Sequence, residues 1–69
     1  METKTSPFTD RQLEIAQLVA NGLNSKAIGE KLAISRTTVE THLYNIKKIA
    51  QVKNAPELIA KLLREKLIN

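Results

Sequence analysis

The apolar residues of this 69-residue chain recur at the spacing of α-helices. In the first such segment they fall on one helical face. They are Ile15, Ala16, Leu18 and Val19. No stretch alternates apolar and polar positions as a strand does, and no segment repeats another. The pattern predicts an all-α fold, a four-helix bundle. Its helices are expected over about 10–20, 25–32, 35–50 and 56–67.

N-cap residues indicate where each predicted helix begins. Thr9 is followed three residues later by Gln12, the spacing of a capping box, so the first helix is predicted to begin at Asp10. Ser25 and Ser35 are the predicted N-caps of the second and third helices. The fourth helix has Asn54 as a cap and Pro56 in its first turn, where a missing N–H costs nothing.

Residues 1–6 contain no apolar residue after the first methionine and are predicted to be a disordered tail. Residues 7–69 are then a single folded domain. A chain this short buries only about 60% of the surface that its unfolded form exposes, which argues against a self-contained enzyme with a deep pocket. The longest apolar runs, about three residues, are far below the roughly 20 needed to cross a bilayer.

The charge balance favours a polyanionic partner. Eleven Lys and Arg residues against seven Asp and Glu give a net charge of +4, and there is no cysteine. The chain therefore has no disulfide framework and no thiolate metal site. His42 has no second ligand at a suitable spacing, so a half-buried structural role is favoured over metal binding. No cofactor, metal or small-molecule ligand is expected.

The third predicted helix has two distinct faces. At 100° per residue its apolar side chains form one narrow inward stripe. They are Val39, Leu43, Ile46 and Ala50. The opposite face is polar, planar or cationic, as a helix that reads a surface requires. It holds Thr37, Thr41, Tyr44, Asn45 and Lys48.

The second and third helices are spaced as a helix-turn-helix. Gly29 lies inside the first of them, Ala33 lies four residues later in the turn, and Val39 lies six residues further on, where it would fill the angle between the helices. These linked positions are more specific than net charge. The turn often carries glycine, so Ala33 predicts ordinary right-handed backbone angles there.

These positions belong to a longer motif that resembles the LuxR/FixJ/GerE-type DNA-binding domain. The resemblance covers nearly everything from Phe8 to Ala60. It rests on the runs Phe8-Thr9-x-Arg11-x-x-Glu14-Ile15, Ala20-x-Gly22-Leu23-Asn24-Ser25-Lys26-x-Ile28 and Leu32-x-Ile34-Ser35-x-x-Thr38-Val39-x-x-His42-x-x-Asn45-Ile46, with Val52. It implies a domain of bacterial transcription regulators, with the third helix reading DNA and the fourth mediating dimerisation.

The resemblance also implies roles for individual residues. The base-reading positions fall on Glu40, Thr41 and Tyr44, and a carboxylate such as that of Glu40 accepts from cytosine N4. Phosphate contacts fall on Lys26, Thr37, Thr38, Asn45 and Lys48, and Lys47 is added to this set.

The fourth helix carries more apolar residues than one core-facing stripe needs, and this surplus predicts a homodimer. The expected dimer interface is Leu58, Leu62 and Leu63. Two copies would read an inverted repeat in double-stranded DNA. RNA polymerase is a further candidate partner, and the expected location is the bacterial cytoplasm, at the nucleoid.

Two other functions compete with this one. A sigma-factor region-four-like domain shares the helix-turn-helix, although the run from Thr38 to Ile46 and the fourth helix argue against it. A protein-interaction module that sequesters another regulator would keep the fold without binding DNA. Glu40 and the modest net charge keep this alternative open.

Overall fold

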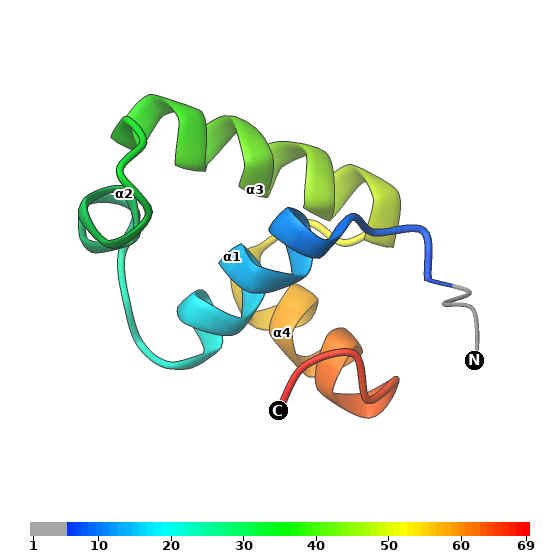
Figure 1. The fold of residues 1–69 in the computed structure, drawn as a ribbon. Coiled ribbons are helices and arrows are strands. Elements are labelled where there is room, and N and C mark those ends of the chain that lie inside the picture. Colours follow the sequence, from blue (N-terminus) through cyan, green and yellow to red (C-terminus); the bar gives the residue numbers. More distant parts are fainter. Residues whose placement is uncertain (1–5) are drawn as a thin grey trace.

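The computed structural model describes residues 6–69, which form four α-helices and no strand (Figure 1). They are α1 (Asp10–Ala20), α2 (Ser25–Leu32), α3 (Arg36–Ala50) and α4 (Ala55–Arg64). The all-α prediction is confirmed. Most of the predicted tail, residues 1–5, lies outside the described residues, whereas the Ser6 hydroxyl accepts a hydrogen bond from the Phe8 N–H at 3.1 Å.

Side-chain caps fix where the helices begin. Thr9 and Gln12 form the predicted capping box, because the Gln12 N–H donates to Thr9 Oγ1 at 3.1 Å and the Thr9 N–H donates to Gln12 Oε1 at 3.0 Å. Ser35 accepts from the Thr38 N–H at 3.0 Å, so the predicted cap of α3 is also confirmed.

The prediction that Ser25 caps α2 is wrong. Asn24 is the cap, with extended backbone angles and a side-chain oxygen that accepts from the Ala27 N–H at 2.9 Å. Ser25 is already helical. Asparagine and serine are both favourable N-caps, so two adjacent candidates could not be separated by residue type alone.

The fourth helix is shorter than predicted. It ends at Arg64, and Lys66 adopts a left-handed backbone with φ of 61°, which turns the chain back. Ile68 returns to the core at 5% exposure. The last residue, Asn69, exchanges two hydrogen bonds of 2.7 Å with the Gln17 side chain. The apolar pattern continues past the helix because this returning segment is itself buried.

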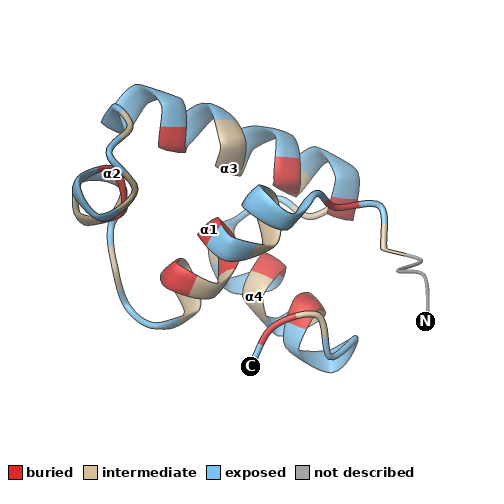
Figure 2. Cartoon of the chain, in the orientation of Figure 1, coloured by how far each residue is buried: buried red, intermediate tan, exposed pale blue. Residues whose placement is uncertain are grey.

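The core lies where the inner faces of all four helices meet (Figure 2). Its fully buried large side chains are Ile15, Ile28, Val39, Ile46, Leu58 and Leu62. Helix α3 packs on both α1 and α2 and also contacts α4. Figure 2 shows the buried positions of α3 facing α1, while the opposite side of the helix is exposed. This packing sets which face of α3 remains available.

The angle between α2 and α3 depends on a backbone contact at Gly29. A Cβ atom placed there would lie 2.7 Å from the carbonyl oxygen of Ile34. The Ile34 N–H also donates to the Gly29 carbonyl at 2.9 Å. The small residue predicted inside the helix-turn-helix is therefore required by the turn itself, because any side chain would force the two backbones apart.

The prediction of right-handed angles at Ala33 is wrong. Ala33 is left-handed, with φ of 61° and ψ of 41°, and closes α2 through a hydrogen bond from its N–H to the Gly29 carbonyl. Residue type favours right-handed angles, but the short turn must reverse the chain immediately after α2. The fold therefore imposes a conformation that costs an alanine about 1–2 kcal/mol.

We expect Gly29→Ala to lower the free energy of unfolding by about 1–2 kcal/mol. A 2.7 Å contact with a backbone atom costs about 2–3 kcal/mol, the upper part of the overpacking range, and this outweighs the gain of about 1 kcal/mol in helix propensity. Urea denaturation measures the difference, with the exposed Glu30→Ala as the control. An unchanged or higher stability would show that the close approach is not a constraint.

Ala33→Gly is expected to raise the free energy of unfolding by about 0.5–1 kcal/mol, because glycine removes the left-handed strain at the cost of a more flexible unfolded chain. The same substitution at Ala27, inside α2, should instead be destabilising by about 1 kcal/mol. Thermal unfolding of both variants checks the opposite signs. Destabilisation by Ala33→Gly would contradict the assignment of strain to this turn.

Candidate nucleic-acid interface

The outer face of α3 presents most of the residues predicted to contact DNA. The buried Val39, Ile46 and Ala50 fix the rotation of the helix about its axis. The predicted residues on α3 that are exposed as a result are Thr37, Thr38, Glu40, Thr41, Tyr44, Asn45 and Lys48. Lys47 differs from them because it is half-buried, in the last turn of the helix. The outward face is thus continuous from the first turn to the last.

Tyr44 is the largest exposed side chain on this face, with 59% exposure. The Nζ atom of Lys48 lies 5.3 Å from the centre of its ring, within the range of a cation–π interaction. A residue predicted to read bases is therefore coupled to one predicted to hold phosphate. The spacing of four residues on one helix face could have indicated this pair.

Glu40 is paired with a residue that the sequence analysis missed. Arg36 Nε donates to Glu40 Oε2 at 3.2 Å, one helical turn earlier on α3. The cation offsets the negative charge of Glu40 on the outer face of α3. The same four-residue spacing was the available signal, but Arg36 lies outside the motif positions that carried the resemblance.

The helix N-termini separate the structural helices from the helix-turn-helix pair. The first turns of α1 and α4 contain Asp10 and Glu57, as the positive end of a helix dipole favours. Neither α2 nor α3 has an acid in its first turn. Their first turns carry Lys26 and Arg36, whereas in α1 the cation Arg11 is accompanied by Asp10. A cation without an acid in the first turn is unfavourable for an isolated helix and favourable for binding an anion.

These two N-termini border one surface depression. It is lined by Asn24, Ser25, Lys26, Arg36 and Glu40. The fold therefore brings Lys26, which the resemblance assigned to phosphate, next to the start of the predicted reading helix. The N-terminus of α2, with Lys26, suits a phosphate, whereas Arg36 is paired with Glu40 in the same depression.

Some residues predicted to contact phosphate also have structural contacts. The Thr38 hydroxyl accepts from Ser35 Oγ at 2.8 Å, so it belongs to the cap of α3 while its own O–H can still donate. His42 is half-buried on the flank of α3, as predicted. Within residues 6–69 no His, Asp, Glu and Cys side chains gather in a group of three suited to a metal.

The predicted dimer interface is corrected for two of its three residues. Leu58 and Leu62 are both 0% exposed and pack in the core of their own chain, so they cannot contact a second copy without opening it. Leu63 is 44% exposed and remains available. The apolar surplus on α4 is smaller than the sequence suggested, because the core uses a wider arc of the helix.

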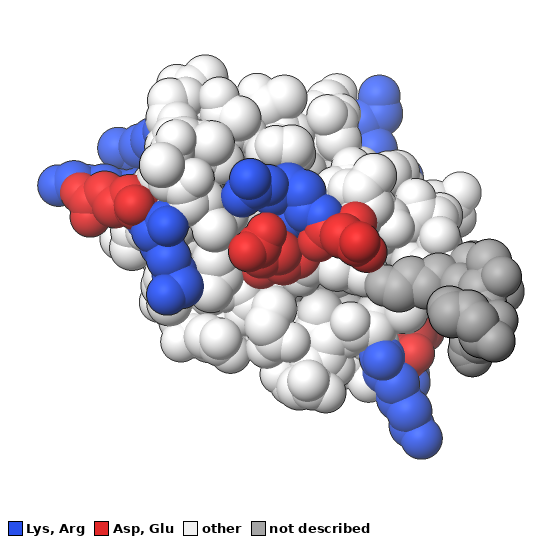
Figure 3. Space-filling model, viewed as in Figure 1, with Lys and Arg blue, Asp and Glu red and all other residues white. Residues whose placement is uncertain are grey.

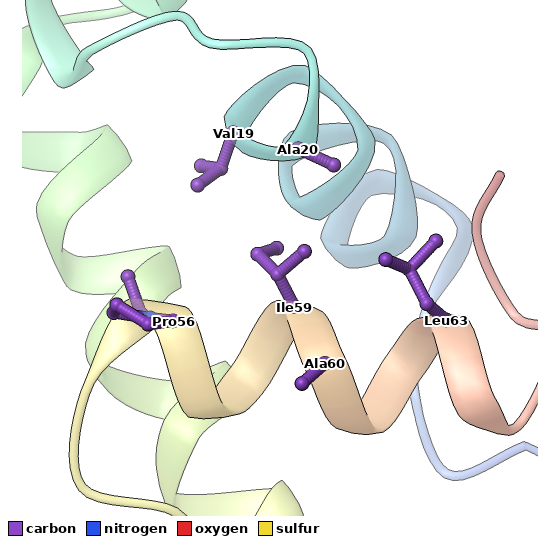
Figure 4. A pocket seen from close by; sticks show the side chains of 7 residues that line it. Val19, Ala20, Pro56, Ile59, Ala60 and Leu63 are labelled. Carbon is purple, nitrogen blue, oxygen red and sulfur yellow. The ribbon is translucent and has the colours of Figure 1, made fainter.

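Leu63 lies beside an apolar groove between α1 and α4. The groove is lined by Val19, Ala20, Ala55, Pro56, Ile59, Ala60 and Leu63. Figure 4 shows Ile59 and Leu63 pointing from α4 toward α1. This groove and the outer face of α3 are separate surfaces with opposite chemistry, one apolar and one polar and cationic.

Charge alone does not mark the interface. On the face shown in Figure 3, acidic side chains lie beside basic ones and no continuous basic patch is visible. The ion pair of Arg11 and Glu14, with Nη1 and Oε1 3.6 Å apart, likewise combines opposite charges on α1. The placement of individual cations at helix ends is thus more informative than the net charge.

No helix in residues 6–69 has the length and apolar character needed to cross a bilayer.

Two helices joined by a tight turn, with a polar outer face on the second, define a helix-turn-helix domain. Residues 6–62 match the family described as bacterial regulatory proteins, luxR family. The chain belongs to this family of DNA-binding transcription regulators. The resemblance stated from the sequence is confirmed.

Two bacterial regulatory proteins are similar to most of this chain. Oxygen regulatory protein NreC of Staphylococcus carnosus (strain TM300) is 42% identical over 62 residues, which is 90% of this chain and 29% of NreC. NreC of Staphylococcus aureus (strain JH9) is 42% identical over 67 residues, or 93% of this chain and 31% of that protein. The chain thus spans about a third of the length of these relatives.

Solved structures share the fold. Transcription factor GerE superposes with a TM-score of 0.89 and 33% identity, covering 93% of this chain and 96% of GerE. Response regulator ChrA of a heme-sensing two-component system gives a TM-score of 0.86 and 32% identity, covering 96% of this chain and 33% of ChrA. The four-helix arrangement is therefore that of LuxR-family regulators.

Proposed function

We propose that this domain recognises a specific double-stranded operator by placing α3 in the major groove. The observation that carries the proposal is the exposed polar face of α3, with the cationic N-terminus of α2, at Lys26, at one edge of it. A phosphate seated at that edge would direct the first turns of α3 toward the bases. Glu40, Thr41 and Tyr44 would then meet base edges.

The backbone contacts supply affinity without sequence information. Their candidates are Lys26, Thr37, Thr38, Asn45, Lys47 and Lys48. Each neutralised phosphate releases counterions, so affinity should fall steeply with salt. Lys48 has a second role, since it also lies over the ring of Tyr44. A regulator bound in this way would act at the nucleoid, with RNA polymerase as a partner at promoters.

Selection from a random duplex pool tests this function. An enriched motif is expected, and Thr41→Ala with Tyr44→Ala should flatten the discrimination between motif variants. Lys26→Ala should weaken all sequences alike and lower the salt slope by about 1. Lys26 is a cleaner phosphate probe than Lys48, because removing Lys48 also frees the Tyr44 ring.

The outcome that would contradict the proposal is also specific. Binding with no enriched motif and little dependence on salt would favour the protein-interaction module instead. An enriched motif whose variants are still discriminated after both alanine substitutions would show that the outer face of α3 does not read the bases.

Dimerisation through the groove between α1 and α4 belongs to the same proposal. One module of this size has a small footprint for selective binding, and two copies would read an inverted repeat. The support in the chain is the exposed Leu63 next to an apolar groove. This interface replaces the one predicted through Leu58 and Leu62.

Leu63→Gln is therefore expected to weaken binding to an inverted repeat while leaving binding to a single half-site unchanged. Ile49→Gln is the matched control, because Ile49 is 40% exposed but does not line the groove. Titrations against both duplexes and sedimentation of the complexes measure the effect. Equal effects of the two substitutions would contradict a dimer at this groove.

A further inference from the structure

Arg36 occupies a position that helix stability does not explain. It is the first residue of α3, where a positive charge opposes the helix dipole. Its partner Glu40 lies four residues later, and acid before base is the more favourable order on a helix. The two side chains are 69% and 53% exposed, so their pairing contributes little to stability. Such a local conflict is characteristic of a functional site.

The geometry of the pair leaves complementary groups available. The hydrogen bond joins Arg36 Nε to Glu40 Oε2 at 3.2 Å. This bond engages neither of the two Nη groups of Arg36, nor Oε1 of Glu40. The pair therefore presents donors and an acceptor side by side, in the depression between the starts of α2 and α3.

This combination matches one base pair in the major groove. Guanine offers the O6 and N7 acceptors to an arginine, and cytosine offers its N4 donor to a carboxylate. The two sets of groups lie in the same C·G pair. Glu40 alone would be repelled by nearby phosphates, and Arg36 both neutralises it and restricts its direction.

We propose that Arg36 and Glu40 act as one specificity-determining unit that reads a C·G base pair. Arg36 is then a base-reading and positioning residue rather than a surface charge. The inference rests on the proposed entry of α3 into the major groove and adds a residue and a base preference to it.

Selection from a random duplex pool, followed by titrations, tests the unit. The titrations compare the selected operator with one in which the C·G pair is replaced by T·A. The wild-type chain should prefer C·G at one position of the site by about tenfold or more. Arg36→Ala and Glu40→Ala should each abolish that preference at the same position, and the double variant should lose no more than either single one.

Two controls separate this unit from general electrostatics. Lys26→Ala removes a cation from the same depression without touching the pair, so it should weaken all sequences and keep the preference. Arg36→Lys keeps the charge and loses the planar fork, so it should lose the preference. Circular dichroism verifies that each variant is folded, as expected for exposed side chains.

The proposal is overturned if Arg36→Ala weakens all sequences uniformly, as Lys26→Ala does, or if the two single substitutions affect different positions. If a motif is enriched and its recognition depends on Thr41 and Tyr44 but not on Glu40, this inference is overturned while the proposed function stands. If the wild-type chain enriches no motif, this inference and the proposed function fail together.

Discussion

The architecture depends on the contact between Gly29 and the backbone of Ile34. A Cβ atom at Gly29 would lie only 2.7 Å from the Ile34 oxygen, so α2 and the following turn meet without room for a side chain. The turn then reverses through the left-handed Ala33, and α3 begins beside the N-terminus of α2. Because Gly29 has no side chain, the N-termini of α2 and α3 can border the same depression.

Function follows from how charge is placed on those ends. Helices α1 and α4 have acids where the dipole favours them, and they supply core packing. Helices α2 and α3 have cations and no acid in their first turns. Arg36 is offset by Glu40, and the positive end of α2, with Lys26, favours an anion. A duplex supplies that anion along its backbone, which links the charge of this helix end to binding.

Sequence reasoning was accurate where local rules decide the structure. Helix number, the capping box at Thr9 and the outward face of α3 depend on periodicity and capping chemistry within a few residues. It failed where the fold overrides local preference. Ala33 is left-handed because the turn demands it, and Leu58 is buried because the whole bundle closes over it. The pairing of Arg36 with Glu40 was missed because Arg36 is not a motif position, although the two residues are one helical turn apart.

The most direct test of this account is the map of backbone amide shifts in NMR spectra as a duplex containing the selected operator is added. The account predicts that the largest shifts lie at the starts of α2 and α3, around Lys26 and Arg36, and along the outer face of α3 at Thr41 and Tyr44. Largest shifts in the groove between α1 and α4, with the starts of α2 and α3 unaffected, would contradict it.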